Sequence, residues 1–66
     1  MFIAIQDSII NIEEIRNVNT FSTSFTVCFK NPNHPTDWLR FDYKTNKEMK
    51  EDLARVTEAC LNYKKN

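Results

Sequence analysis

Residues 44–66, KTNKEMKEDLARVTEACLNYKKN, decide the fold class of this chain because they predict one amphipathic helix near its C-terminal end. The apolar side chains of this stretch recur at intervals of four and three residues, which is the spacing of one helix face. They are Met49, Leu53, Val56, Cys60 and Tyr63. No glycine or proline interrupts the pattern, so we expect a helix from about 46 to about 63 that packs this stripe on a sheet.

The start of that helix is marked by a capping box, Thr45-Asn46-Lys47-Glu48. The Thr45 hydroxyl can accept the backbone N–H of Glu48, and the Glu48 carboxylate can reach back to the backbone N–H of Thr45. Acidic residues then follow near the positive end of the helix dipole, and Lys64 and Lys65 lie near its negative end. The two ends of the helix are therefore both specified locally.

Upstream of the helix, residues 21–30, FSTSFTVCFK, alternate in the manner of a half-buried strand. One face would carry Phe21, Thr23, Phe25, Val27 and Phe29, and the other Ser22, Ser24, Thr26, Cys28 and Lys30. Residues 31–36, NPNHPT, have the prolines and asparagines of a connecting loop. Residues 37–43, DWLRFDY, alternate again, with Leu39, Phe41 and Tyr43 on one face. We expect the two strands to form an antiparallel hairpin.

The N-terminal third has weaker signals. Residues 2–5, Phe-Ile-Ala-Ile, predict a short strand, and Asp7-Ser8 predicts a turn. Residues 12–15 suit a single helical turn, flanked by short strands at 9–10 and 16–19. The chain has no glycine, so its turns must use asparagine, aspartate, proline or serine, or be longer than the tightest hairpins.

These elements predict an α+β fold: a small antiparallel β-meander of three to four strands, packed on one face by a C-terminal α-helix. Its 66 residues are expected to form a single domain, 1–66, with the strands within 2–43. A chain of this size buries roughly 60% of its unfolded surface. Its stability is then expected to be about 3–10 kcal/mol.

Charge, hydropathy and cysteine content argue against several function classes. The nine basic residues balance nine acidic ones, whereas nucleic-acid binders usually show a basic surplus. The N-terminus, MFIAIQDS, has no charged region typical of a signal peptide, and no apolar run approaches the ~18 residues of a membrane span. Cys28 and Cys60 lack metal-site spacing, and we expect them to be reduced thiols. The predicted compartment is the cytoplasm.

No residue pattern predicts catalysis, a cofactor, a metal or a small-molecule substrate. His34, the single histidine, lies near Asp37 in the loop, but no nucleophile accompanies the pair. Without glycine there is no phosphate-binding loop of the P-loop or dinucleotide type. We therefore expect a protein that is not an enzyme.

The sheet face turned away from the helix offers the one candidate site. It is expected to carry Thr26, Cys28 and Trp38, with Arg40, Lys30 and Asp42 toward its edges. Part of the strand 2–5 is also expected there, because both of its faces are apolar. A solvated face would normally be more polar, and tryptophan is enriched where proteins bind one another.

Three interpretations of this face remain open. It can be a homo-oligomer or protein-partner interface, it can be covered by residues 7–20, or it can stack single-stranded nucleic acid on Trp38 with Arg40 and Lys30 nearby. We favour the first. The expected function is a small, non-catalytic intracellular protein-interaction module, with single-stranded nucleic-acid binding as the alternative.

Overall fold

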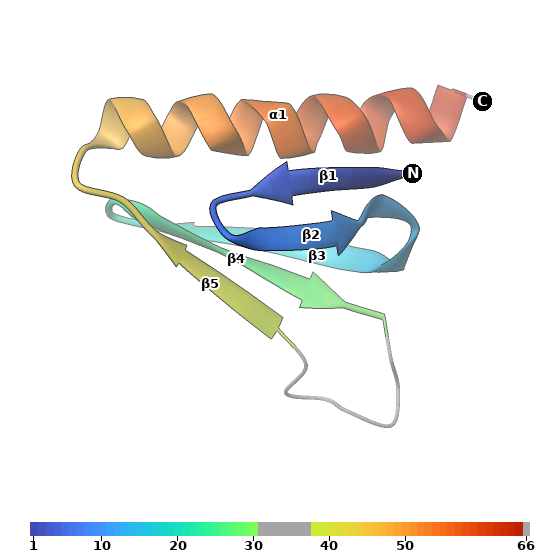
Figure 1. The fold of residues 1–66 in the computed structure, drawn as a ribbon, viewed down its shortest axis with the longest axis horizontal. Helices are drawn as coiled ribbons and strands as arrows, with labels where there is room; N and C mark the ends of the chain where they lie inside the picture. Colours follow the sequence, from blue (N-terminus) through green and yellow to red (C-terminus); the bar gives the residue numbers. More distant parts are fainter. Residues whose placement is uncertain (31–37, 66) are drawn as a thin grey trace.

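The computed structural model describes residues 1–30 and 38–65 and confirms the α+β class (Figure 1). In chain order the elements are β1 (Phe2–Ile5), β2 (Ser8–Asn11), the 3₁₀ turn η1 (Ile12–Glu14), β3 (Ile15–Phe21), β4 (Ser24–Phe29), β5 (Trp38–Asp42) and α1 (Asn46–Lys65). The strands form two antiparallel sheets, β1–β2 and β3–β4–β5. The three-stranded sheet is the predicted antiparallel meander, and β1 and β2 form a second, two-stranded sheet beside it.

The helix begins as its capping box predicts. The backbone N–H of Glu48 donates to Thr45 Oγ1 at 3.2 Å. The Glu48 carboxylate turns back to Thr45 too, but it accepts the Thr45 hydroxyl at 3.2 Å rather than the expected backbone N–H. The helix then continues to Lys65, two residues beyond the predicted end.

Both tight hairpins form without glycine. The pairing of Ile5 with Ser8 and of Phe21 with Ser24 leaves two residues in each turn. The first turn residue has a positive φ in both cases, 50° at Gln6 and 55° at Ser22. Such a φ is unfavourable for a residue with a side chain, so the packing of the flanking strands must hold it in place.

The second hairpin corrects the prediction for residues 21–30, which are not one strand. The turn at 22–23 ends β3 and starts β4. Because Phe21 pairs directly with Ser24, the two side chains share a face. Phe21 therefore lies opposite to the face that carries Phe25, whereas a continuous strand would have put the two together.

The three-stranded sheet confirms the predicted antiparallel pairing across the loop. Residues 24–28 of β4 pair with 38–42 of β5 in a continuous register. On the other side of β4, β3 pairs with a register shift between Ile15 and Asn17, which marks a β-bulge. Residues 31–36, predicted to be the loop, lie outside the described residues.

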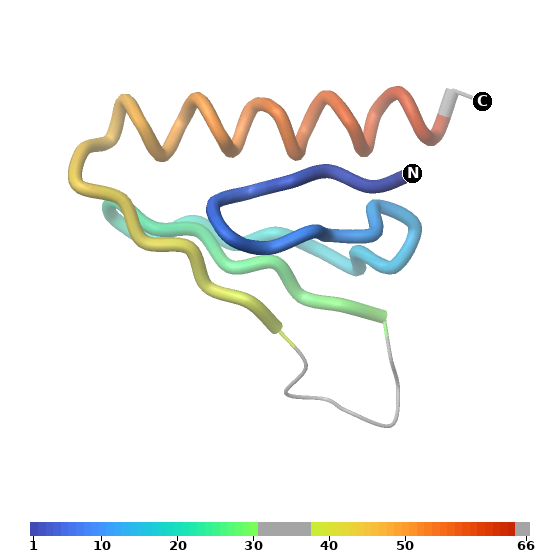
Figure 2. The backbone as a smooth tube through the Cα atoms, in the orientation of Figure 1, coloured from blue at the N-terminus to red at the C-terminus, as the bar shows by residue number. Residues whose placement is uncertain are grey.

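Residues 7–20 follow the predicted order. The helical turn is η1, and the Asn11 side chain caps it by accepting the N–H of Glu13 at 3.1 Å. The β1–β2 hairpin before it and β3 after it are the two flanking strand regions. Figure 2 shows the backbone doubling back at this corner.

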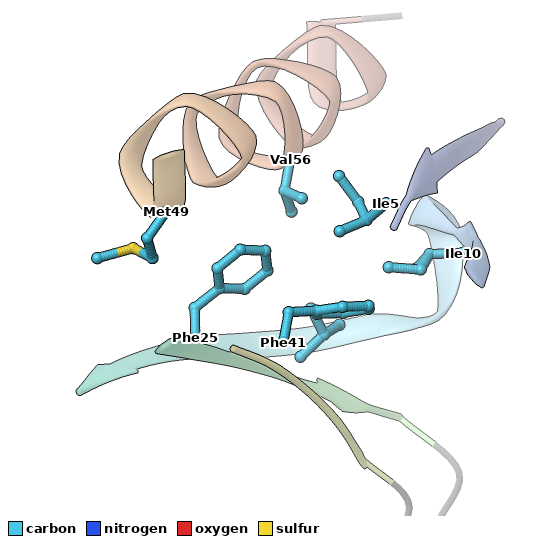
Figure 3. Close-up of a cluster of buried hydrophobic side chains, with 7 residues drawn as sticks. Ile5, Ile10, Phe25, Phe41, Met49 and Val56 are labelled. Carbon is cyan, nitrogen blue, oxygen red and sulfur yellow. The ribbon is translucent and has the colours of Figure 1, made fainter. Parts of the chain in front are cut away.

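The core lies between three walls, as Figure 3 shows: α1, the β3–β5 sheet and the β1–β2 hairpin. Its buried side chains are Ile5, Ile10, Phe25, Val27, Phe41, Met49 and Val56. The ring of Phe25 lies 5.3 Å from that of Phe41 and 5.7 Å from that of Tyr43. The helix contributes the predicted stripe, although only Met49 and Val56 of it are buried.

The sequence predicted that part of the strand 2–5 lies on the outer face of the larger sheet, and this prediction is wrong. Ile5 is buried in the core, and Ile3 packs against it. The guanidinium of Arg55 donates from Nη2 to the carbonyl of Ala4 at 2.8 Å, which joins β1 to the helix. One apolar face of the strand closes the third wall of the core through Ile5, whereas Phe2 on its other face is 68% exposed.

Candidate interaction surface

The face of the β3–β5 sheet turned away from the core is the candidate surface, called the outer sheet face here. Strand register assigns to it Asn17, Asn19, Phe21, Ser24, Thr26, Cys28, Trp38, Arg40 and Asp42. Two large apolar side chains on it are open to solvent: Trp38 is 50% exposed and Phe21 is 79% exposed. They stand at opposite corners, because Phe21 is next to the β3–β4 turn and Trp38 is at the far end of β5.

Four of the five predicted site residues are brought together on this face. Cys28 pairs with Trp38, and Thr26 pairs with Arg40. Lys30 is not with them, because β4 ends at Phe29 and Lys30 lines a pocket beside the helix. Phe21 was missed as a member of this face, and the turn at 22–23 that places it there carries no glycine to signal it.

Charge on the outer sheet face is largely compensated within the chain. Arg40 Nε lies 3.0 Å from Asp42 Oδ1, and both side chains are mostly exposed. Near the bulge, Arg16 Nε donates to Asn17 Oδ1 at 3.0 Å. Asn19 Nδ2 lies 3.9 Å from the Cys28 sulfur. The outer sheet face is thus polar, and its Arg40 and Asp42 charges balance, whereas Arg16 donates to a neutral amide and keeps its charge. An aromatic ring lies at two corners of the face.

Residues 7–20 do not cover the outer sheet face. Within this range, β3 extends the sheet sideways, and Ile10 of β2 points into the core on the other side. The exposure of Phe21 and Trp38 follows from this arrangement. The interpretation in which the N-terminal segment shields this face is therefore wrong.

A pocket of about 80 Å³ lies on the other side of the molecule, near the end of α1. It is lined by Ile12, Glu13, Ile15, Lys30, Cys60, Tyr63 and Lys64. The Tyr63 hydroxyl donates to Glu13 Oε1 at 2.9 Å, and this carboxylate raises the pKa of Tyr63. Pockets for drug-sized molecules are several times larger, about 300–1,000 Å³.

Both cysteines are free thiols, Cys28 on the outer sheet face and Cys60 in this pocket. Among residues 1–30 and 38–65, no three histidine, cysteine or acidic side chains come close enough to hold a metal ion. His34 and Asp37, the one pair considered for acid–base chemistry, lie outside the described residues. No helix in the described part of the chain is long and apolar enough to span a membrane.

Comparison with protein-family models, with curated proteins and with solved structures found no match for this chain.

Proposed function

We propose that this protein is a small, non-catalytic interaction module that self-associates through the β3–β5 sheet, with Trp38 in the interface. The observation that carries the proposal is the half-exposed Trp38 on a sheet whose other face is already filled by the core. Tryptophan is among the residues most enriched in binding hot spots. An apolar ring that stays in water when the core is complete gains most from a second protein surface.

The charge of the chain supports a protein partner, and a second copy in particular. The formal net charge is zero, so two copies do not repel each other over long range. On the outer sheet face, the guanidinium of Arg40 is already paired with Asp42. The reducing cytoplasm suits the two free thiols, and we include that compartment in the proposal.

Single-stranded nucleic acid is the alternative occupant, and the same geometry supports it less. Such sites combine stacking aromatics with a groove of unpaired cations that follows the phosphates. Here Arg40 is already paired with Asp42 at 3.0 Å, and Lys30 lines the pocket beside the helix instead of continuing β4. We therefore treat nucleic-acid binding as one of the results that the experiment below can give.

Sedimentation equilibrium from about 1 to 200 µM tests the proposal, with Trp38→Ser as the variant and Phe2→Ser as its matched control. Phe2 is also an exposed aromatic residue, but it lies on the β1–β2 hairpin. We expect a mass above 7.8 kDa for the native chain. Trp38→Ser should weaken association by at least about 30-fold, the size of a hot-spot loss, and Phe2→Ser should leave it unchanged.

Three results would overturn the proposal. The first is a monomer over the whole range with Trp38 fluorescence typical of indole in water. The second is loss of association in Phe2→Ser but not in Trp38→Ser. The third is binding of a labelled single-stranded oligonucleotide, measured by fluorescence anisotropy, that needs Trp38 and falls steeply as salt rises.

A further inference from the structure

Among residues 1–30 and 38–65, main-chain groups on the outer edge of β5 have no strand partner, and they follow a defined pattern. The N–H of Tyr43 donates to the carbonyl of Thr23 at 3.0 Å, so this directly opposed pair is hydrogen-bonded. Hydrogen-bonded and non-bonded pairs alternate along an antiparallel ladder. Leu39 therefore points its N–H and C=O toward β4, whereas Trp38 and Arg40 point theirs away from the sheet. No other described strand pairs with that edge.

One end of this edge is already closed. The main-chain groups of Asp42 also point away from the sheet, like those of Trp38 and Arg40. Its carbonyl accepts a hydrogen bond from the Gln6 side-chain amide at 2.9 Å. The open part of the edge is therefore two residues, Trp38 and Arg40, with Leu39 between them. Its register with β4 is continuous, so no bulge twists it away from an incoming strand.

Leu39 makes this edge unlike the others. Its side chain lies on the core face, opposite the fully buried Val27, yet it remains 38% exposed. The residue between the two outward-pointing positions of β2 is Ile10, which is 2% exposed and has little apolar surface left to bury. On β3 the corresponding residue is the polar Asn19, and that strand also carries the bulge. On β1, Arg55 occupies the Ala4 carbonyl.

We propose that β5 pairs antiparallel with β5 of a second copy of this chain, with Leu39 opposite Leu39 at a two-fold axis, to give a continuous six-stranded sheet. This inference rests on the proposed self-association and assigns its geometry. The axis is perpendicular to the sheet, so both core faces stay on the same side. Trp38 and Arg40 of each copy form hydrogen-bonded pairs with Arg40 and Trp38 of the other, which uses all four open main-chain groups of each edge.

The side chains agree with this register. The two Leu39 side chains meet in a non-hydrogen-bonded pair, where side chains approach most closely. On the outer sheet face, each Trp38 ring lies beside Arg40 of the other copy, and a guanidinium over an indole is a favourable cation–π pair. The exposed Trp38 ring of the single chain thereby gains a packing partner from the second copy.

A register centred on Arg40 is less favourable on two counts. It sets two guanidinium groups directly opposite each other, and like charges opposed across strands destabilise a sheet. It also needs the main chain of Asp42, whose carbonyl already accepts from Gln6.

Because β5 has five residues, the interface falls below the ~1,200 Å² of a standard complex. We therefore expect reversible association at micromolar concentration.

Disulfide trapping tests the register directly, in a background carrying Cys28→Ser and Cys60→Ser. In the proposed register, Leu39→Cys places two Cα atoms about 4.5 Å apart, within the range that a disulfide bridges. Arg40→Cys is the matched control on the same strand. Its two Cα atoms are offset by two residues and lie about 8–9 Å apart, which exceeds the limit of about 7 Å.

The expected result is a disulfide dimer of Leu39→Cys that forms at least about tenfold faster than that of Arg40→Cys. Circular dichroism of the reduced variants establishes that both are folded. Phe21→Ser, at the far corner of the outer sheet face, should leave the sedimentation behaviour unchanged.

Equal trapping of the two variants, or faster trapping of Arg40→Cys, would overturn the edge pairing. So would loss of association in Phe21→Ser, since Phe21 lies two strands from the proposed seam. In either case self-association of the native chain would still support the proposed function. A native chain that stays monomeric would overturn both proposals together.

Discussion

Phe25 and Phe21 lie close together on neighbouring strands of one sheet, yet one is fully buried and the other is almost fully exposed. Phe25 packs between Phe41 and Tyr43 beneath the helix. Phe21, on the outer sheet face, has the same apolar surface but stands in water. The comparison separates two situations of apolar residues in a small domain: one face of the sheet packs into the core, and the other leaves an aromatic side chain in water.

The difference in burial between Phe25 and Phe21 predicts the largest change in the free energy of unfolding that we expect from a single substitution. Phe25→Ala should cost about 3–5 kcal/mol, because it removes a buried ring and leaves a cavity. That is a large share of the about 3–10 kcal/mol expected for the whole fold, and the variant is expected to be partly unfolded at 25 °C. Phe21→Ala should change stability by about 0.5 kcal/mol or less. Urea titration followed by circular dichroism measures both, and similar costs would show that the two faces are not distinct.

The same contrast exists within β2, on adjacent residues. Ile10 lies in the core, whereas Ile9 is 76% exposed. Ile10→Ala should cost about 2–5 kcal/mol, and Ile9→Ala about 0.5 kcal/mol or less. The pair tests whether the β1–β2 hairpin is a true wall of the core. A low cost for Ile10→Ala, measured by thermal or urea unfolding, would mean that the hairpin contributes little to the packing.

The sequence predicts some parts of this arrangement well and others poorly. The Met49–Tyr63 stripe and the alternation of 37–43 are regular, so the helix and β5 follow from periodicity, and with them the shared face of Thr26, Cys28, Trp38 and Arg40. Phe21 and Lys30 were misplaced because both lie where a strand ends. Their faces depend on a turn at 22–23 and on the end of β4 at Phe29, and neither boundary alters the apolar–polar alternation.

The N-terminal hairpin shows a second limit. Residues 2–5 are apolar on both faces, so their sequence does not select the layer they join. The choice is made by contacts more than fifty residues away in the chain, such as the hydrogen bond from Arg55 to the Ala4 carbonyl. Periodicity describes each element by itself and carries no information about such pairs.

A smaller effect is expected at the rim of the core face, where Tyr43 stacks on Phe25. Its hydroxyl donates to Asp52 Oδ2 at 2.8 Å. Burial, with the Asp52 carboxylate adding to it, raises the pKa of Tyr43 well above its usual 10.0. Tyr43→Phe should cost about 1 kcal/mol at pH 7, the typical value of one hydrogen bond.

The pH dependence of that cost follows from the raised pKa. The unfolded chain releases the Tyr43 proton near pH 10, while the folded chain keeps it, so this stabilisation is complete below pH 10 and declines as the pH rises above 10. Urea midpoints of the native chain and of Tyr43→Phe should therefore stay apart up to about pH 10 and converge as the pH rises further. Tyr63→Phe, at the exposed end of the helix, should show a weaker trend of the same sign, because Glu13 also raises the pKa of Tyr63. A constant gap for Tyr43→Phe would mean that folding does not raise the pKa of Tyr43.

The smallest expected effect has the opposite sign and concerns the turn beside Phe21. Ser22 has a φ of 55°, which glycine adopts without the steric cost that a side chain imposes. Part of that gain is lost because glycine makes the unfolded chain more flexible, so Ser22→Gly should stabilise the fold by about 0.5–1 kcal/mol. Gln6→Gly relieves a similar φ in the other hairpin but removes the hydrogen bond to the Asp42 carbonyl.

The two glycine variants therefore compare a turn on the outer sheet face with a turn joined to the β5 edge. Ser22→Gly should raise the melting temperature, and Gln6→Gly should raise it less or lower it. The loss of the Gln6 amide would also open the Asp42 end of β5, where a second strand could then pair. An equal gain in both variants would show that the Gln6–Asp42 bond contributes nothing to stability, and that the β5 edge is open along its whole length.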